Sequence, residues 1–218
     1  MTGRLGITLL LAAVLVGTAA AAPGDPEKRA INAADQAWAQ RINLTLRDLP
    51  GGFRQGPAQS SESGGFTCAS FAPDLSSFTI TGRASSHSFV RRDGTTLFSA
   101  AEIFRSRSDE RGDWGRSARR EALPCIAQML EQLSSGGLQL KVTSSAMRAA
   151  PHVGERSISF RIAARVSAGG AAVKTWFDII GVSRGRADAT LAVISFRAPP
   201  SASLEQSLVA KLARRLAA

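Results

Sequence analysis

The chain has 218 residues, of which 44% are hydrophobic and 20% charged, a composition that is typical of a globular protein and excludes a disordered one. Its net charge is +10 at pH 7, which favours anionic partners such as cell-wall polymers, anionic lipid headgroups or acidic proteins; the alternative is a bias toward arginine in a GC-rich coding sequence. No basic run with interleaved aromatic residues occurs and tyrosine is absent, so we expect no nucleic-acid partner.

The N-terminus has the pattern of a secretory signal peptide. Arg4 is the only charge, and the residues that follow it up to Ala22 are almost all apolar or small. We expect residues 1–21 to be removed, which leaves 22–218 as a single secreted or envelope-resident domain. The alternative is an uncleaved membrane anchor, since the apolar segment is barely long enough to span a bilayer. Membrane association is expected only in that case.

Two elements are expected before the first predicted strand. The segment from Pro26 to Leu49 predicts a helix, because its apolar residues recur at roughly helical spacing and proline suits the first turn of a helix. Residues 55–65 are rich in glycine, serine, glutamine and proline, which predicts a loop that leads to Cys68.

The middle of the chain predicts strands followed by helix. Residues 78–82 alternate in polarity and predict a strand, and the segments on either side of the turn at 93–94, up to Phe104, predict a hairpin. Residues 109–133 have apolar side chains along one side, which predicts a helix that Pro124 breaks or kinks.

The C-terminal third contains the clearest strand signals. Residues 138–142 and 157–166 alternate in polarity, and Gly169–Gly170 is typical of a two-residue hairpin turn, which fixes the strand register. The turn pairs Val166 with Val173, Ile162 with Phe177 and Phe160 with Ile179 on one face, and Arg165 with Lys174, Ala163 with Trp176 and Arg161 with Asp178 on the other.

A second tight turn is expected at 184–185, where it would pair Trp176 with Val193 and Ile180 with Ala189. Both faces of this meander are then substantially apolar. An antiparallel sheet with one face exposed to solvent would carry polar side chains on that face, so we expect both faces to be covered. The sequence therefore predicts a single α+β domain, in which helices pack on both faces of a central antiparallel sheet with a C-terminal β-meander.

The last helix is expected after the two prolines at 199–200. Ser203 and Gln206 have the spacing of a capping box, and basic residues near the end of the chain suit a helix C-terminus. The apolar stripe of this helix is predicted to consist of Leu208, Val209, Leu212 and Leu216.

The two cysteines of the chain, Cys68 and Cys125, predict a disulfide, because an even number in an exported protein indicates pairing. The alternative is a catalytic cysteine, which would need one of the two histidines, His87 or His152, beside it. Two isolated histidines without a carboxylate or cysteine cluster make a poor zinc site, so we expect no metal.

Catalytic signals are weak. No His-Glu-x-x-His helix, Walker loop or Gly-x-Gly-x-x-Gly motif occurs, so we expect no enzyme activity and no cofactor. Glu102 falls among apolar residues of a predicted strand, as general acids with a raised pKa do. A glutamate with an arginine partner at a strand edge is the commoner reason for such a pattern.

One set of polar residues points to a ligand site. The first hairpin register places Arg161, Arg165, Lys174, Trp176 and Asp178 on a single face of the sheet. Like charges directly opposite each other, as in Arg165 and Lys174, destabilise a sheet, and such a pair can mark an anion site. The alternative is that both side chains are simply solvated near the hairpin tip, while Arg161 pairs with Asp178.

Five short segments, at 49–54, 98–105, 123–126, 181–186 and 212–216, carry a resemblance to known proteins. They are similar to segments of exported actinobacterial proteins of the PknH-type kinase sensor-domain and LpqN-like (PsbP-like) groups. The resemblance implies a central antiparallel sheet with helices against it, and a cleft that binds a ligand or partner rather than catalysing a reaction. Cys68 and Cys125 fit one bridge, whereas the kinase sensor group has two, so this chain departs from the group in that respect.

The expected function is therefore an exported cell-envelope binding or accessory domain of this sensor-domain type. The sequence does not identify the envelope ligand or protein partner, and the basic charge favours an anionic one. One alternative is an envelope hydrolase or transferase with an unrecognised site. Another is a structural protein that docks on an anionic wall or membrane surface.

Overall fold

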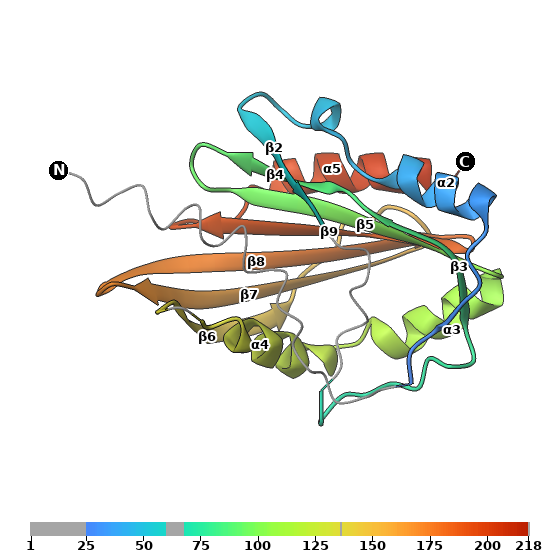
Figure 1. The fold of residues 1–218 in the computed structure, drawn as a ribbon, viewed down its shortest axis with the longest axis horizontal. Helices are drawn as coiled ribbons and strands as arrows, with labels where there is room; N and C mark the ends of the chain where they lie inside the picture. Colours follow the sequence, from blue (N-terminus) through green and yellow to red (C-terminus); the bar gives the residue numbers. More distant parts are fainter. Residues whose placement is uncertain (1–24, 60–67, 136, 218) are drawn as a thin grey trace.

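The computed structural model describes residues 25–59, 68–135 and 137–217 (Figure 1). The predicted signal peptide, residues 1–21, lies outside these ranges. Within them, no helix combines the length and the apolar character that a membrane crossing requires.

Nine strands of the described chain form one sheet in the order β1-β3-β5-β9-β8-β7-β6, and β4 pairs with both β5 and β2. All pairs are antiparallel except β1 with β3. The strands are β1 (Lys28–Arg29), β2 (Phe53–Ala58), β3 (Thr79–Ser85), β4 (His87–Arg91), β5 (Thr96–Phe104), β6 (Gln139–Met147), β7 (Arg156–Ala168), β8 (Ala171–Arg184) and β9 (Ala187–Phe196).

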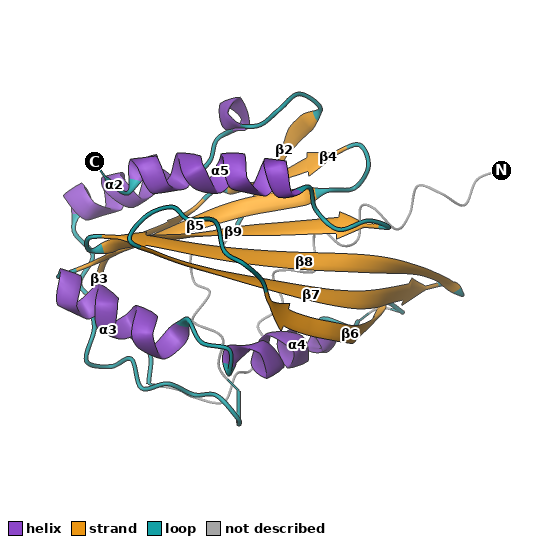
Figure 2. Cartoon of the chain, turned by 180° about the vertical axis from the view of Figure 1, so that it is seen from behind, coloured by secondary structure: helices purple, strands orange, loops and turns teal. Residues whose placement is uncertain are grey.

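Helices lie against both faces of this sheet, as predicted (Figures 1 and 2). The helices are α2 (Ala33–Ile42), the short 3-10 helix η2 (Leu46–Asp48), α3 (Arg107–Ser117), α4 (Ala122–Gln132) and α5 (Ala202–Arg215). Helices α2 and α5 cover one face, and α3 and α4 cover the other, so the domain has three layers. The described residues form two large apolar cores and a small third cluster of Leu75, Phe78, Ile80 and Phe104.

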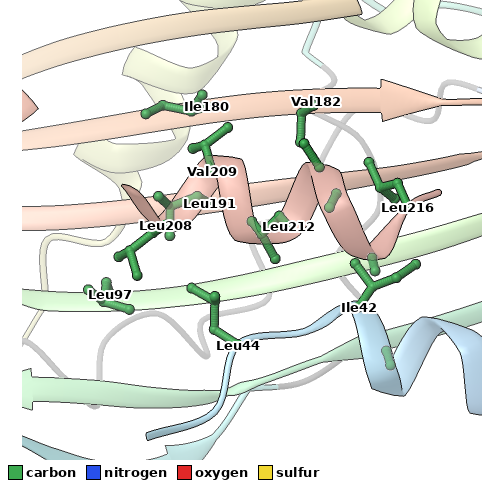
Figure 3. Packing of buried hydrophobic residues seen from close by; sticks show 14 of the residues in the cluster. Ile42, Leu44, Leu97, Ile180, Val182, Leu191, Leu208, Val209, Leu212 and Leu216 are labelled. Atoms are coloured by element: carbon green, nitrogen blue, oxygen red, sulfur yellow. The ribbon is translucent and has the colours of Figure 1, made fainter. Parts of the chain in front are cut away.

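The first core lies between α5, α2 and the sheet (Figure 3). The predicted stripe of α5 is buried here: Leu208, Val209, Leu212 and Leu216 are each at most 3% exposed. They pack toward β8, β9 and β5, where Ile180, Leu191 and Leu97 point at the helix. Burying such side chains stabilises a fold by about 1.5–3 kcal/mol each.

The second core lies between α4 and the meander. It joins the alternate residues of β7 that were predicted to face inward with one side of α4. Its buried members are Ala122, Leu123, Ile126, Leu130, Leu138, Leu140, Ile158, Phe160, Ile162, Ala164, Val166, Phe177 and Ile194. Because side chains of β7 alternate between the two faces, this core lies on the opposite face from Arg161 and Arg165.

The first predicted hairpin register is confirmed in full. Val166 pairs with Val173, and every pair that the turn predicts, through Phe160 with Ile179, is present. Gly169 and Gly170 adopt φ of +55° and +80°, which side chains with a Cβ rarely adopt. These two glycines allow the tight turn that sets the register of β7 on β8.

The second predicted register is wrong by two residues. Trp176 pairs with Ser195 rather than Val193, and Ile180 pairs with Leu191. The turn uses Gly185 and Arg186, with Gly185 at φ +67°, so it begins one residue later than expected. A two-residue shift keeps every side chain on its own face, so the predicted layers are unaffected.

The N-terminal elements differ from the prediction. Lys28–Arg29 pairs with β3 as a parallel strand, and the helix begins only at Ala33, where Asn32 caps it by accepting from the Asp35 N–H at 2.9 Å. Gly82 on β3 lets α2 approach, since a Cβ there would lie 2.3 Å from the Asp35 carbonyl oxygen. The loop expected at 55–65 begins instead as β2, which pairs with β4.

The expected helix at 109–133 is two helices. α3 ends at Ser117 and α4 starts at Ala122, so Pro124 lies in the first turn of α4, where proline is tolerated, and does not kink a longer helix. The expected capping box of α5 is also wrong, because the helix already starts at Ala202.

The disulfide joins Cys68 to Cys125, with their Cα atoms 5.3 Å apart. It ties the segment that leads into β3 to the first turns of α4, on the α3–α4 side of the sheet. Both half-cystines are at most 7% exposed. The link therefore fastens the segment before β3 to the second core.

Candidate functional site

The five residues predicted to share a face do lie on one face of β7 and β8, because their pairing is that of the confirmed register. This is the face that α5 covers in part, as the neighbouring Ile180 and Val182 belong to the α5 core. The four charged residues among them nevertheless fall into two groups. One is a buried ion-pair network near α5, and the other is exposed toward the hairpin tip, which extends past the end of α5 (Figure 2).

The buried network is centred on Asp178, which is completely buried. Its Oδ1 accepts from Nε of Arg161 at 2.7 Å, and its Oδ2 accepts from Nη1 of Arg148 at 2.8 Å. Nη1 of Arg148 also lies 3.2 Å from a carboxylate oxygen of Glu205 on α5. The alternative considered for Arg161 and Asp178, a structural pair, is therefore the arrangement found.

Sequence reasoning missed Arg148 and Glu205. Glu205 stands at helical spacing from Leu208, Val209 and Leu212, so a charged residue in the buried stripe of α5 was a signal that could have been read. Arg148 follows the end of β6 in an irregular segment, where no local pattern marks it. Only the fold brings it to Asp178.

Glu205 is electrostatically unusual. Burial and the neighbouring Asp178 carboxylate raise the pKa of Glu205 to about 8, so it retains its proton at neutral pH. A cavity of about 270 Å³ adjoins it. The lining includes Arg148, the exposed His152, Ser159 and Gln206. A protonated carboxyl beside an ionised one can donate and accept a proton, which is the chemistry of acid–base pairs.

The exposed group consists of Arg165 and Lys174, which lie directly opposite each other. On the other side of Arg165, the register adds Lys141 of β6, which sequence reasoning missed because the β6–β7 pairing could not be derived from a short turn. None of the three has an ion-pair partner among the described residues. Trp176 is only 9% exposed, and Nζ of Lys174 lies 5.0 Å from the centroid of its ring.

Trp176 therefore positions a cation rather than offering a surface for stacking. An ammonium over an indole face is attracted to it by about 0.5–1 kcal/mol at an exposed site. The contact keeps Lys174 close to the sheet, beside Arg165, instead of extended into solvent.

A wider groove of about 550 Å³ lies between the 47–50 segment and α5. It contains three basic side chains, but two of them are engaged: Arg91 with Asp93 at 2.7 Å, and Lys211 with the backbone oxygen of Asp48. This groove thus offers fewer available charges to an anion than the exposed residues of the meander.

Glu102 has the arginine partner expected of a strand-edge glutamate, because it lies 2.6 Å from Arg83. Burial also raises its pKa, and it faces Asp188 across the sheet. Under α3, burial and the nearby Glu102 raise the pKa of Asp113 to about 8. These carboxyl groups form an acidic cluster between α3 and the sheet.

This cluster predicts a pH dependence of stability. Because the pKa of Asp113 is raised in the folded chain, its stabilising contribution is present below about pH 4 and is lost as the pH rises toward 8. We expect Asp113→Asn to be more stable than the wild type at pH 8 and to show a flatter pH profile in urea unfolding. Asp93, whose pKa is lowered to about 2, is the control, and Asp93→Asn should change the pH dependence of stability only at acidic pH. Identical slopes for wild type and Asp113→Asn between pH 5 and 8 would contradict this.

The remaining candidates have structural roles or none. His87 is exposed, and its Nδ1 lies 3.1 Å from the Gly56 carbonyl oxygen. Within the described ranges no group of histidine, cysteine, aspartate and glutamate could hold a metal.

A Gly-x-Ser-x-Gly pattern at 181–185, which sequence reasoning missed, places Ser183 inside β8, fully buried and 3.1 Å from Nε of Arg156. A nucleophilic serine of this motif lies on an exposed turn between a strand and a helix, and Ser183 does not.

Comparisons with known proteins give little. No family model matches the sequence, and no curated protein does. A solved structure that matches is the extracellular domain of PknH from Mycobacterium tuberculosis, with a TM-score of 0.49 and 7% sequence identity, covering 89% of this chain and 99% of that chain.

Proposed function

We propose that this protein is an exported binding or accessory domain of the cell envelope, of the sensor-domain type, which binds an anionic ligand without transforming it. The observation that carries the proposal is the exposed pair Arg165 and Lys174, with Lys141 beside it. Like charges at opposing positions of a sheet are destabilising, and a ligand that neutralises them would account for this placement. The disulfide supports an oxidising compartment outside the cytoplasm.

The test is salt-dependent retention on an immobilised anionic polymer. The double variant Arg165→Gln with Lys174→Gln is expected to elute at clearly lower salt than the wild type. Arg111→Gln with Arg214→Gln is the matched control, because it removes two exposed arginines with no ion pair in the described chain and leaves the same net charge. Equal elution of the two double variants would show that only total charge matters, and it would overturn the proposal.

A hydrolase or transferase is the second candidate, favoured by the Glu205 and Asp178 pair beside the 270 Å³ cavity. The contact of Arg148 with both carboxyl groups supports a structural role instead. Turnover of an envelope component that Glu205→Gln abolishes, in a variant that stays folded, would decide for the enzyme.

A further inference from the structure

The exposed cations of the meander continue beyond the predicted pair. Lys141 of β6 pairs with Arg165 of β7, and Arg165 pairs with Lys174 of β8. The chain after β9 adds Arg197, whose N–H donates to the Lys174 carbonyl oxygen at 2.9 Å and extends the ladder by one residue. Three neighbouring strands, β6, β7 and β8, and the residue that follows β9 thus each present one exposed basic side chain, and the four residues lie opposite one another across the sheet. We call these four residues the basic row.

The basic row is a line rather than a pocket. Neighbouring strands lie about 4.8 Å apart, so its four positions span about 14 Å across the strands. The described residues provide no ion-pair partner for any of the four. Glu131 of α4 approaches β6, but its carboxylate accepts a hydrogen bond from the Val142 N–H at 2.8 Å. It therefore binds the backbone of β6 and not a side chain of the basic row.

Arg197 carries an additional cost. Its φ is +69°, which makes it the one residue other than glycine with a positive φ in the described part of the chain. A residue with a Cβ is less stable by about 1–2 kcal/mol in this conformation, so glycine would suit the backbone better. The presence of arginine at this strained position, level with Lys174, indicates that its side chain is used.

The surroundings favour a soluble polymer over a bilayer. The hairpin tip beside the row consists of Ala168, Gly169, Gly170 and Ala171. Of the large exposed apolar side chains of the described chain, Ile31 and Leu46 belong to other segments, and Met147 lies at the opposite end of β6 from Lys141. Stable attachment to a membrane surface needs bulky apolar side chains or a lipid in addition to charge. A linear polymer needs only a series of charges at matching intervals.

We propose that the basic row binds a linear polyanion, a polymer with a phosphate or carboxylate on each repeat, which lies across strands β6 to β9 at right angles to them. This inference rests on the proposed function and deepens it, since it specifies a polymeric rather than a small anion. Several weak contacts along one chain give a polymer about 100-fold or more higher affinity than its monomer. Binding should release one counterion or nearly one for each cation that is engaged.

The experiment measures the affinity of long-chain polyphosphate and of inorganic phosphate over a series of NaCl concentrations. For the wild type, four engaged cations predict a slope of about −3 in log K against log salt, and each of Lys141→Gln and Arg197→Gln should reduce its size by about 0.7. Polyglutamate should behave like polyphosphate, and Arg214→Gln should leave the slope unchanged.

Arg197→Gly separates binding from folding. Removing the strained Cβ should leave the protein at least as stable as the wild type, while binding of polyphosphate weakens as in Arg197→Gln. If inorganic phosphate binds as tightly as the polymer, and Lys141 and Arg197 have no effect, the polymer inference fails while the proposed anion site survives. If neither polymer nor phosphate binds, both fail. Binding to anionic lipid vesicles without binding to the polymers would replace the inference by a membrane surface.

Discussion

Replacing Asp178 with alanine is expected to lower the free energy of unfolding by about 3–5 kcal/mol. The carboxylate is fully buried and holds both Arg148 and Arg161, so its loss leaves two partly buried guanidinium groups without their main counter-charge. Urea unfolding followed by fluorescence of the three tryptophans would measure the change.

Two controls identify the cause of this loss. Asp93→Ala removes the exposed pair with Arg91 and should cost less than about 1 kcal/mol. Adding Arg161→Met to an Asp178→Leu variant should recover part of the lost stability, because it removes one of the uncompensated charges. A loss of less than 1 kcal/mol for Asp178→Ala would show that the network contributes little to the fold.

Breaking the disulfide is expected to cost roughly 4 kcal/mol, the chain-entropy value for a loop of this size, since Cys68 and Cys125 are 57 positions apart in the sequence. The bridge constrains the unfolded chain and anchors the segment before β3 to α4. Unfolding with and without reductant, compared with a variant in which both cysteines are alanine, measures the change. The variant should match the reduced wild type and be insensitive to the reductant.

The loosening should be local. Hydrogen exchange on reduction should increase at residues 68–76 more than in β7, β8 and β9, whose ladders are independent of the bridge. Free thiols in the unreduced exported protein, or equal stability with and without reductant, would contradict this account and return the cysteines to a reactive role.

The fold was predictable where local signals set a long register. Gly169 and Gly170 fix the β7–β8 hairpin, and the alternation on both sides then assigns every side chain to a face. That assignment required helices on both faces, and the structure has them. The second turn was misplaced by one residue because Arg184 and Arg186 flank Gly185 symmetrically, and the sequence offers no second glycine to choose between them.

The errors lie where tertiary contacts override local pattern. The 26–49 segment is apolar at helical intervals, yet its first residues pair with β3 as β1 because that edge of the sheet is open to them. Pro124 was expected to break a helix and instead lies in the first turn of one, since the local sequence does not show where α3 ends.

The candidate site was predictable only in the part that depends on strand register. Arg161, Arg165, Lys174, Trp176 and Asp178 follow from one register, so their shared face could be derived. The division into a buried network and an exposed row could not, because it depends on Arg148 and Glu205, which arrive from other elements. Lys141 and Arg197 likewise join the row only through the pairing of β6 and the end of β9.

The most direct test of the anion-binding surface is to map where a polyanion touches the folded protein. In an amide NMR titration with long-chain polyphosphate at low salt, the largest shifts are expected at Lys141, Arg165, Lys174 and Arg197 and at their neighbours on the same strands. Little change is expected around Glu205 and the cavity beside it. Shifts concentrated at that cavity, or in the groove at 47–50 against α5, would contradict the assignment of the basic row as the binding surface.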